Sequence, residues 1–254
     1  MDARGLWALG DYPAIAERLQ PAAEALVEAA GVQDGHRVLD VAAGTGNTAA
    51  AALGRGARVV ASDFAPTMVE LGRRRLPGIE WVEADAQDLP FEDGGFDRVL
   101  STFGAMFAPD PARTAAELLR VTKPGGVVGM TTWAAGSILD AAARILREAL
   151  QAASAEDPAT RWQDHDDIRG HFGGARVTVE TRTLTWRFES PEAWLSFISG
   201  KAPPIVAARA AIGEDRWPDV AARILAAVAD THITPDGGFL EETPYLLIVA
   251  TREA

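Results

Sequence analysis

The 254-residue sequence contains no cysteine. This absence excludes disulfide bonds, thiolate zinc sites and a cysteine nucleophile. Two other residue types are nearly missing. Lysine occurs only at Lys123 and Lys201, and tyrosine only at Tyr12 and Tyr245.

Long apolar runs and an excess of positive charge are also missing. No segment approaches the roughly 20 apolar residues that cross a bilayer. The first ten residues contain no apolar run like that of a signal peptide. The formal net charge of −12 repels phosphate backbones and anionic membrane surfaces. We therefore expect a cytoplasmic protein that binds neither nucleic acid nor membranes.

The first two thirds of the sequence alternate strand-like and helix-like segments. Short β-branched runs are separated by segments whose apolar residues have helical spacing. This alternation is typical of βαβ units and of a parallel sheet covered by helices on both faces. The strands are expected at residues 37–43, 57–63, 79–85, 96–102, 127–133, 176–189 and 245–252. The predicted fold class is therefore α/β, with a doubly wound, mostly parallel seven-stranded sheet.

The last third of the chain is organised differently. A mostly helical stretch over about residues 190–230 lies between the last two expected strands and is predicted to be a helical insertion. The sequence then divides into an N-terminal helical cap (1–36), a core (37–135) and the remainder of the fold (136–254).

A glycine-rich turn after the first expected strand is the sharpest local signal. Gly44, Gly46 and Ala49 match the spacing of a dinucleotide-binding turn, and Asp63 lies about 20 residues further on. This motif alone would allow a nicotinamide cofactor. Asp40 argues against it, because a carboxylate at the end of the first strand would repel a pyrophosphate. S-Adenosylmethionine (SAM) suits Asp40 better because it carries an ammonium and a sulfonium but no phosphate, and its ribose diol suits Asp63.

With this motif, the sequence resembles a class I SAM-dependent methyltransferase of the group that contains the ubiquinone and menaquinone biosynthesis methyltransferases. Five segments carry the resemblance, in the order and spacing of that family. They are Val38-Leu-Asp-Val-Ala-Ala-Gly-Thr-Gly46, Ala61-Ser-Asp-Phe-Ala-Pro-Thr-Met68, Ala84-Asp-Ala-Gln-Asp-Leu-Pro-Phe91, Phe96-Asp-Arg-Val-Leu-Ser101 and Leu119-Arg-Val-Thr-Lys-Pro-Gly-Gly126. The resemblance implies a Rossmann-like fold, SAM as methyl donor and S-adenosylhomocysteine as product.

The resemblance also implies which residues bind SAM. Asp40 would order the loop and the amino group, Asp63 would bind the ribose hydroxyls, and Asp85 would accept a hydrogen bond from the adenine amino group. The other expected cofactor contacts are Tyr12, Ala42, Gly44, Gly46, Phe64, Met68, Ala86 and Ser101. Ala42 stands where the family has its first glycine, and alanine tolerates strand dihedrals but not a positive φ. Tyr12 is equally consistent with an aromatic residue that docks the N-terminus on the core.

Methyl transfer needs few catalytic residues, because SAM carries an activated methyl group and the protein mainly aligns the acceptor and excludes water. A base helps only where the nucleophile must lose a proton. His165 and His171 are the candidate bases, although a solvated polar face explains them as well. The carboxylates between Asp164 and Asp167 are adjacent in sequence and do not share one helix face, so no metal site is expected.

An apolar acceptor pocket is expected where the fourth and fifth strands end, although its aromatic side chains would equally well form core. Its predicted lining is Phe103, Met106, Phe107 and Trp133, with Trp194 and Phe197 from the helical insertion. We therefore predict methyl transfer to an oxygen or carbon of a hydrophobic small molecule, such as a secondary metabolite or a quinone-like compound, by a monomer or homodimer.

Two other functions are open on the sequence alone. A nicotinamide-dependent oxidoreductase could use the same turn, but neither Tyr12 nor Tyr245 has the lysine partner of a Tyr-x-x-x-Lys pair. A non-catalytic SAM-binding protein would bind SAM without turnover, and nothing in the sequence excludes it.

Overall fold

The computed structural model describes residues 3–151, 158–228, 234 and 238–253. Its elements are α1 (Ala3–Leu6), α2 (Tyr12–Ala29), β1 (Arg37–Val41), α3 (Asn47–Leu53), β2 (Arg58–Asp63), α4 (Pro66–Arg75), β3 (Glu80–Glu83), β4 (Phe96–Thr102), η1 (Ala105–Phe107), α5 (Pro111–Val121), β5 (Thr122–Trp133), α6 (Ile138–Ala149), η2 (Pro158–Trp162), α7 (His165–His171), β6 (Ala175–Phe188), α8 (Pro191–Lys201), α9 (Pro203–Ile212), α10 (Trp217–Val228) and β7 (Phe239–Arg252). Over the described ranges, no helix is both long enough and apolar enough to cross a membrane.

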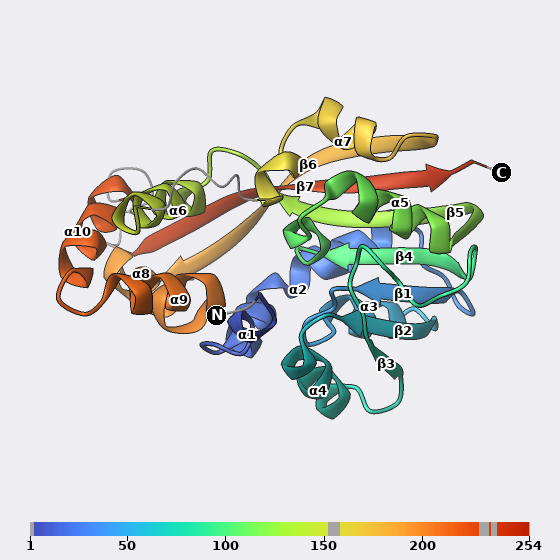
Figure 1. The fold of residues 1–254 in the computed structure, drawn as a ribbon, viewed down its shortest axis with the longest axis horizontal. Helices are drawn as coiled ribbons and strands as arrows, with labels where there is room; N and C mark the ends of the chain where they lie inside the picture. The colour runs from blue at the N-terminus through green and yellow to red at the C-terminus, as the bar shows by residue number, and fades with distance from the viewer. Residues whose placement is uncertain (1–2, 152–157, 229–233, 235–237, 254) are drawn as a thin grey trace. The chain divides into compact units, whose positions relative to one another are not determined.

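Seven strands form one sheet in the order β3-β2-β1-β4-β5-β7-β6 (Figure 1). The pairs β1–β2, β2–β3, β1–β4 and β4–β5 are parallel, whereas β7 runs antiparallel to β5 with Trp133 opposite Tyr245. This topology confirms the predicted mostly parallel seven-stranded sheet. Since the carboxyl ends of parallel strands meet at one edge, the segments that follow β1, β2 and β4 lie there together.

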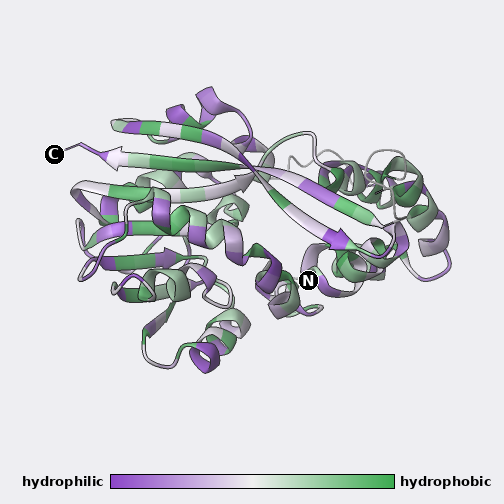
Figure 2. Ribbon diagram, turned by 180° about the vertical axis from the view of Figure 1, so that it is seen from behind, coloured by the Kyte–Doolittle hydropathy of each residue, from purple (hydrophilic) through white to green (hydrophobic). Residues whose placement is uncertain are grey.

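The central strands are buried almost throughout, which explains why their sequences are continuous apolar runs rather than alternations. Only the first residue of β1 and the first of β2 are exposed. Helix α3 packs on β1, β2 and β4, while α5 packs on β4 and β5. Figure 2 shows the resulting hydrophobic stretches along the strands of the sheet.

The fifth strand begins five residues earlier than predicted, because the Lys123–Gly126 segment belongs to β5 instead of forming a separate turn before it. Phe96 pairs with Thr122, and Arg98 pairs with Val127. Two steps along β4 therefore correspond to five along β5, so the extra residues leave the ladder as a bulge. Gly125, with a φ of 72°, supplies the left-handed conformation that this excursion needs.

The described residues fall into two compact units. The helical unit comprises those within Met1–Arg18, Ala134–Glu156 and Thr183–Pro244. The sheet unit comprises those within Leu19–Trp133, Asp157–Arg182 and Tyr245–Ala254. The predicted helical insertion is confirmed as α8, α9 and α10, and its end near residue 230 lies outside the described residues. The division at residues 36 and 135 stays a prediction.

The helical unit has a hydrophobic core of its own, built mainly by α6, α8 and α10. Trp194 of α8 is fully buried there against Phe239, the first residue of β7. The carboxyl of Glu241 is buried beside them. It accepts a hydrogen bond of 2.6 Å from Trp194 Nε1 and one of 2.8 Å from Thr243 Oγ1. The inward alternation of Phe239, Glu241 and Thr243 extends β7 six residues before its predicted start at Tyr245.

Glu241 is expected to make stability fall as the pH rises. Burial raises the pKa of this carboxyl from 4.5 to about 7. Between these values the folded state binds more protons than the unfolded state, so the free energy of unfolding decreases with pH across that window. At about 1.4 kcal/mol per unit, the loss attributable to Glu241 is about 3 kcal/mol.

Urea unfolding at pH 5 and pH 8, for the wild type and for Glu241→Gln, measures this loss. Asp40 also has a raised pKa and contributes in the same direction in both proteins. The difference between the two proteins therefore isolates Glu241. An equal pH dependence in wild type and variant would show that Glu241 does not titrate in this way.

Candidate active site

The turn between β1 and α3 has a backbone that only a few residue types adopt easily. Gly44 has a φ of 56° and Gly46, the N-cap of α3, has a φ of 88°. Glycine takes these left-handed conformations without a steric penalty. The N–H of Gly46 donates to the carbonyl of Ala43, which closes the turn. The glycines of the predicted motif are therefore required by the conformation of the chain.

Ala42 contradicts the expectation that alanine at this position keeps an ordinary strand conformation. Its φ is 52°, in the left-handed region that costs a residue with a Cβ roughly 1–2 kcal/mol. The surrounding structure supplies the reason, because the chain after β4 packs directly on this turn. A Cβ added to Gly104 would lie 2.3 Å from the Ala42 carbonyl oxygen and 2.6 Å from the Ala42 Cβ. Tertiary packing thus holds alanine in the conformation of the family's glycine.

Asp63, the last residue of β2, ties two turns together. Its Oδ2 accepts a hydrogen bond of 2.8 Å from the N–H of Gly44, and its Oδ1 accepts one of 2.9 Å from the N–H of Ala65. The side chain is buried, which raises the pKa of its carboxyl, while the backbone N–H donors oppose that rise. Three backbone N–H groups, those of Gly44, Phe64 and Ala65, favour the charged form, and a carboxylate has about four lone-pair sites, so it can still accept from a ligand hydroxyl.

Asp40 holds the start of α3. Its Oδ2 accepts a hydrogen bond of 2.8 Å from the N–H of Ala49. Complete burial raises the pKa of this carboxyl to about 8, and the nearby Asp63 carboxyl adds to the rise. The predicted ordering of the loop by Asp40 therefore has a structural basis, and its contact with the SAM amino group stays a prediction.

The second oxygen of Asp40 has spare hydrogen-bonding capacity. Oδ1 is buried without a hydrogen bond, and the nearby Thr48 hydroxyl is already 2.8 Å from the Thr102 hydroxyl. A buried acceptor without a donor, beside a turn of left-handed backbone, fits a cationic ligand better than an anionic one. The residues present are thus compatible with the ammonium of SAM.

Four further residues predicted to contact the cofactor differ in exposure. Met68 of α4 and Ala86 are buried, and Phe64 is half-buried. Asp85 is exposed, and its Oδ1 accepts a hydrogen bond of 2.9 Å from the N–H of Gln87, which makes a local turn. The roles of these four residues toward the cofactor stay predictions.

Ser101 lies near the end of β4 and is fully buried. Its Oγ accepts a hydrogen bond of 2.9 Å from the N–H of Ala105. The side chain therefore fixes the turn that leads from β4 into η1. The contact of Ser101 with SAM stays a prediction.

An aromatic cluster, made of Phe103, Trp133 and Tyr245, lies where β4 and β5 end. The rings of Phe103 and Trp133 stack with centroids 3.8 Å apart and an interplanar angle of 14°, and Tyr245 meets Phe103 edge-on at 5.6 Å. Phe103 has a φ of 54°, a strained value for an aromatic residue. Because Gly104 touches Ala42, this cluster adjoins the glycine-rich turn.

Tyr245 is a candidate site residue that the sequence motifs did not indicate. The signal that could have found it is the last expected strand, which places Tyr245 beside Trp133 once antiparallel pairing with the fifth strand is assumed. Burial raises the pKa of the Tyr245 phenol, and the Arg182 side chain opposes the rise. The phenol is therefore un-ionised at neutral pH and can donate a hydrogen bond.

The other predicted acceptor residues fall into two groups. Met106, fully buried, and the half-buried Phe107 belong to η1 in the sheet unit. Trp194 and Phe197 belong to α8 in the helical unit, where Trp194 is core and Phe197 packs against Phe188. The lining role of these residues and the shared pocket stay predictions.

Tyr12 is the first residue of α2 and belongs to the helical unit. Its ring meets that of Trp7 edge-on, with centroids 5.8 Å apart. This contact is consistent with the alternative role of Tyr12, in which its ring docks the N-terminal segment. The role of Tyr12 toward SAM stays a prediction.

The two candidate histidine bases lie on α7, capped by Asp164, whose Oδ1 accepts from the N–H groups of Asp166 and Asp167. His165 is exposed. Nε2 of His171 lies 3.2 Å from the Arg161 carbonyl oxygen. Neither role as a base is tested by these contacts. Within the part of the chain that the structure describes, no three carboxylate or imidazole groups come together as metal ligands would.

Comparison with known proteins places this site in a family. The family model described as a methyltransferase domain matches residues 39–130. The uncharacterized protein Rv1405c of Mycobacterium tuberculosis is 34% identical over 265 residues, which cover 98% of this chain and 93% of that protein. A demethylmenaquinone methyltransferase of Clavibacter sepedonicus is 54% identical over 95 residues, which cover 36% of this chain and 39% of that enzyme.

Solved structures agree with the sequence matches. The YcgJ protein of Bacillus subtilis superposes with a TM-score of 0.65 and 18% identity over 92% of this chain and 99% of that one. Phosphoethanolamine N-methyltransferase 2 of Haemonchus contortus, solved with S-adenosylhomocysteine and phosphomonomethylethanolamine, superposes with a TM-score of 0.60 and 20% identity over 92% of this chain and 53% of that one. These likenesses confirm the Rossmann-like methyltransferase fold.

Fold, glycine-rich turn and family match together define a methyltransferase. The chain belongs to the class I SAM-dependent methyltransferases, and its cofactor is SAM. When bound, SAM supplies the activated methyl group, and the protein's own residues bind the cofactor, orient the acceptor and exclude water.

Proposed function

We propose that this methyltransferase transfers its methyl group to an oxygen or carbon of a hydrophobic, aromatic or quinone-like small molecule. The observation that carries the proposal is the cluster of Phe103, Trp133 and Tyr245 beside the glycine-rich turn. Stacked aromatic side chains recognise planar apolar molecules by area and by ring geometry. The net charge of −12 supports an acceptor other than nucleic acid.

The partial match to a demethylmenaquinone methyltransferase supports the same class of acceptor. The match covers 36% of this chain and 39% of that enzyme, whose name includes a menaquinone precursor. The strain at Phe103 also supports a functional role, because a left-handed aromatic residue persists only where its surroundings hold it. Tyr245 could then donate a hydrogen bond to a carbonyl or phenol oxygen of the acceptor.

Turnover with methyl-labelled SAM over a panel of phenols, quinols and planar polyketides tests this proposal. We expect label transfer to at least one aromatic acceptor, with a product heavier by one methylene. Trp133→Ala should reduce kcat/KM roughly tenfold and leave SAM affinity unchanged, because it removes the stacked ring without touching the turn. Phe91→Leu, which changes an aromatic pair elsewhere in the sheet unit, is the matched control.

SAM binding without transfer to any member of the panel would contradict the proposal and favour a non-catalytic SAM-binding protein. Equal losses in Trp133→Ala and Phe91→Leu would show that the aromatic cluster has no special place in acceptor binding.

A further inference from the structure

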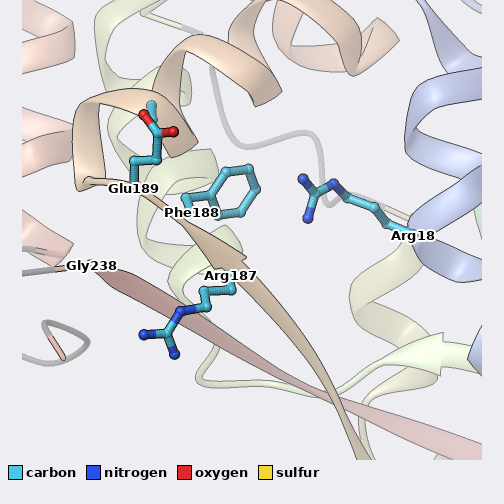
Figure 3. Close-up of a pocket in the computed structure, with 6 residues that line it drawn as sticks. Arg18, Arg187, Phe188, Glu189 and Gly238 are labelled. Atoms are coloured by element: carbon cyan, nitrogen blue, oxygen red, sulfur yellow. The ribbon is translucent and has the colours of Figure 1, made fainter. Parts of the chain in front are cut away.

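The helical unit contains a pocket of about 660 Å³, a size typical of small-molecule sites. Its lining is Arg18, Arg187, Phe188, Glu189, Ala193 and Gly238. Figure 3 shows the Arg18 guanidinium facing the ring of Phe188, with Glu189 on the far side of that ring in this view. The pocket therefore combines an aromatic wall with a cation.

Arg18 has contacts at its backbone and at its guanidinium. Its backbone carbonyl accepts a hydrogen bond of 3.2 Å from Trp186 Nε1. Its guanidinium carbon lies 4.4 Å from the ring centroid of Phe188 and 4.6 Å from that of Phe197. Both contacts are cation–π interactions, in which the rings attract the charge but supply no hydrogen-bond acceptor in the plane of the N–H groups.

No described residue accepts a hydrogen bond from the Arg18 guanidinium or forms an ion pair with it. Lys201, the other cation near Phe197, differs in this respect, because its Nζ pairs with Asp11 at 2.6 Å. Glu241 contributes attraction to Arg18, but its oxygens are occupied by Trp194 and Thr243. Arg18 is thus a positioned cation whose five N–H donors have no protein acceptor in the described ranges.

The other charged residues of the pocket do not satisfy Arg18. Glu189 is exposed and makes no hydrogen bond to it. Arg187 follows Trp186 on β6, and its side chain extends away from the Phe188 ring in Figure 3. A ligand that brings its own anionic group would therefore meet Arg18 without displacing a protein partner.

We propose that this pocket binds a carboxylate-bearing aromatic small molecule, with Arg18 donating paired hydrogen bonds to the carboxylate and Phe188 contacting the ring. A planar guanidinium can donate two parallel hydrogen bonds to the two oxygens of a carboxylate. Hydrogen bonds between charged groups are stronger than those between neutral groups. The proposal concerns binding to the helical unit. It does not depend on methyl transfer and stands apart from the proposed function.

Calorimetric titration of the full chain with 1-naphthoate and with its neutral isostere 1-naphthamide, both without SAM, tests this assignment. We expect the wild type to bind the carboxylate about tenfold or more tightly than the amide. Arg18→Met keeps an unbranched, flexible side chain but removes its charge, and it should abolish that preference. Arg187→Met, which removes the other arginine of the pocket, should keep it.

A purely structural role for Arg18 would lower stability without changing the preference between two isosteric ligands. Circular dichroism checks that each variant is folded. If Arg18→Met does not fold, Arg18→Lys replaces it, because lysine retains the charge but not the two-point geometry. Arg18→Lys should weaken the preference for the carboxylate. The proposal would be overturned if the wild type bound the two ligands equally or bound neither. It would also be overturned if the preference for the carboxylate persisted without Arg18 or was lost in Arg187→Met.

Discussion

Asp63→Ala is expected to weaken SAM binding by at least about 100-fold. The carboxylate accepts the N–H groups of Gly44 and Ala65 and is the predicted partner of the ribose hydroxyls. Hydrogen bonds to a charged group contribute about 1.5–3 kcal/mol each, and 100-fold corresponds to about 2.7 kcal/mol. Removal of the carboxylate therefore loses both the ligand contact and the brace that shapes the turn. Calorimetric titration with SAM measures the change.

The matched control for this substitution is Glu80→Ala. Glu80 is an exposed carboxylate at the start of β3, the strand that pairs with β2. Its replacement by alanine should leave SAM affinity unchanged. Thermal unfolding of both variants separates loss of the site from loss of the fold. An Asp63→Ala protein that folds and binds SAM within threefold of the wild type would show that Asp63 serves only the local backbone.

Gly104→Ala is expected to lower the free energy of unfolding by roughly 3 kcal/mol, the upper range for overpacking. The glycine has a φ of −105°, which any residue adopts, so backbone strain plays no part. The new Cβ would lie 2.3 Å from the Ala42 carbonyl oxygen, and a backbone atom cannot move aside as a flexible side chain would. The glycine-rich turn must shift to accommodate it, so SAM affinity should fall as well.

Gly78→Ala is the control for this second substitution. A Cβ at Gly78 meets no atom within 4 Å, and the residue lies outside the positive-φ region. Urea unfolding should therefore place Gly78→Ala within about 0.5 kcal/mol of the wild type. A Gly104→Ala protein as stable as Gly78→Ala would contradict the close contact between the two segments.

The cofactor turn could be predicted from the sequence because its determinants are local. Gly44 and Gly46 are required because the backbone has a positive φ at each of these positions. Asp63 ends a strand that the sequence pattern identifies. The alternation of strands and helices then indicates a parallel sheet covered by helices on both faces. For these reasons, both the seven-stranded sheet and the family could be predicted from the residues alone.

Other features depend on contacts between residues far apart in the chain, which no local pattern encodes. Ala42 takes a positive φ because Gly104 packs against it, whereas the residue type alone predicts an ordinary strand conformation. Tyr245 joins the aromatic cluster only through the antiparallel pairing of β7 with β5. The buried Glu241 resembles a surface residue in sequence, since its partner Trp194 lies 47 positions away.

The central claim is that the glycine-rich turn holds SAM and not a nicotinamide. Calorimetric titration of the wild-type protein with SAM, S-adenosylhomocysteine and NADH tests it most directly. We predict saturable, one-to-one binding of SAM and S-adenosylhomocysteine and no binding of NADH, because the chain matches a methyltransferase family model over residues 39–130 and a pyrophosphate at the start of α3 would oppose ionisation of the Asp40 carboxyl buried there. Binding of NADH with no binding of SAM would contradict the account and leave Asp40 as a purely structural residue.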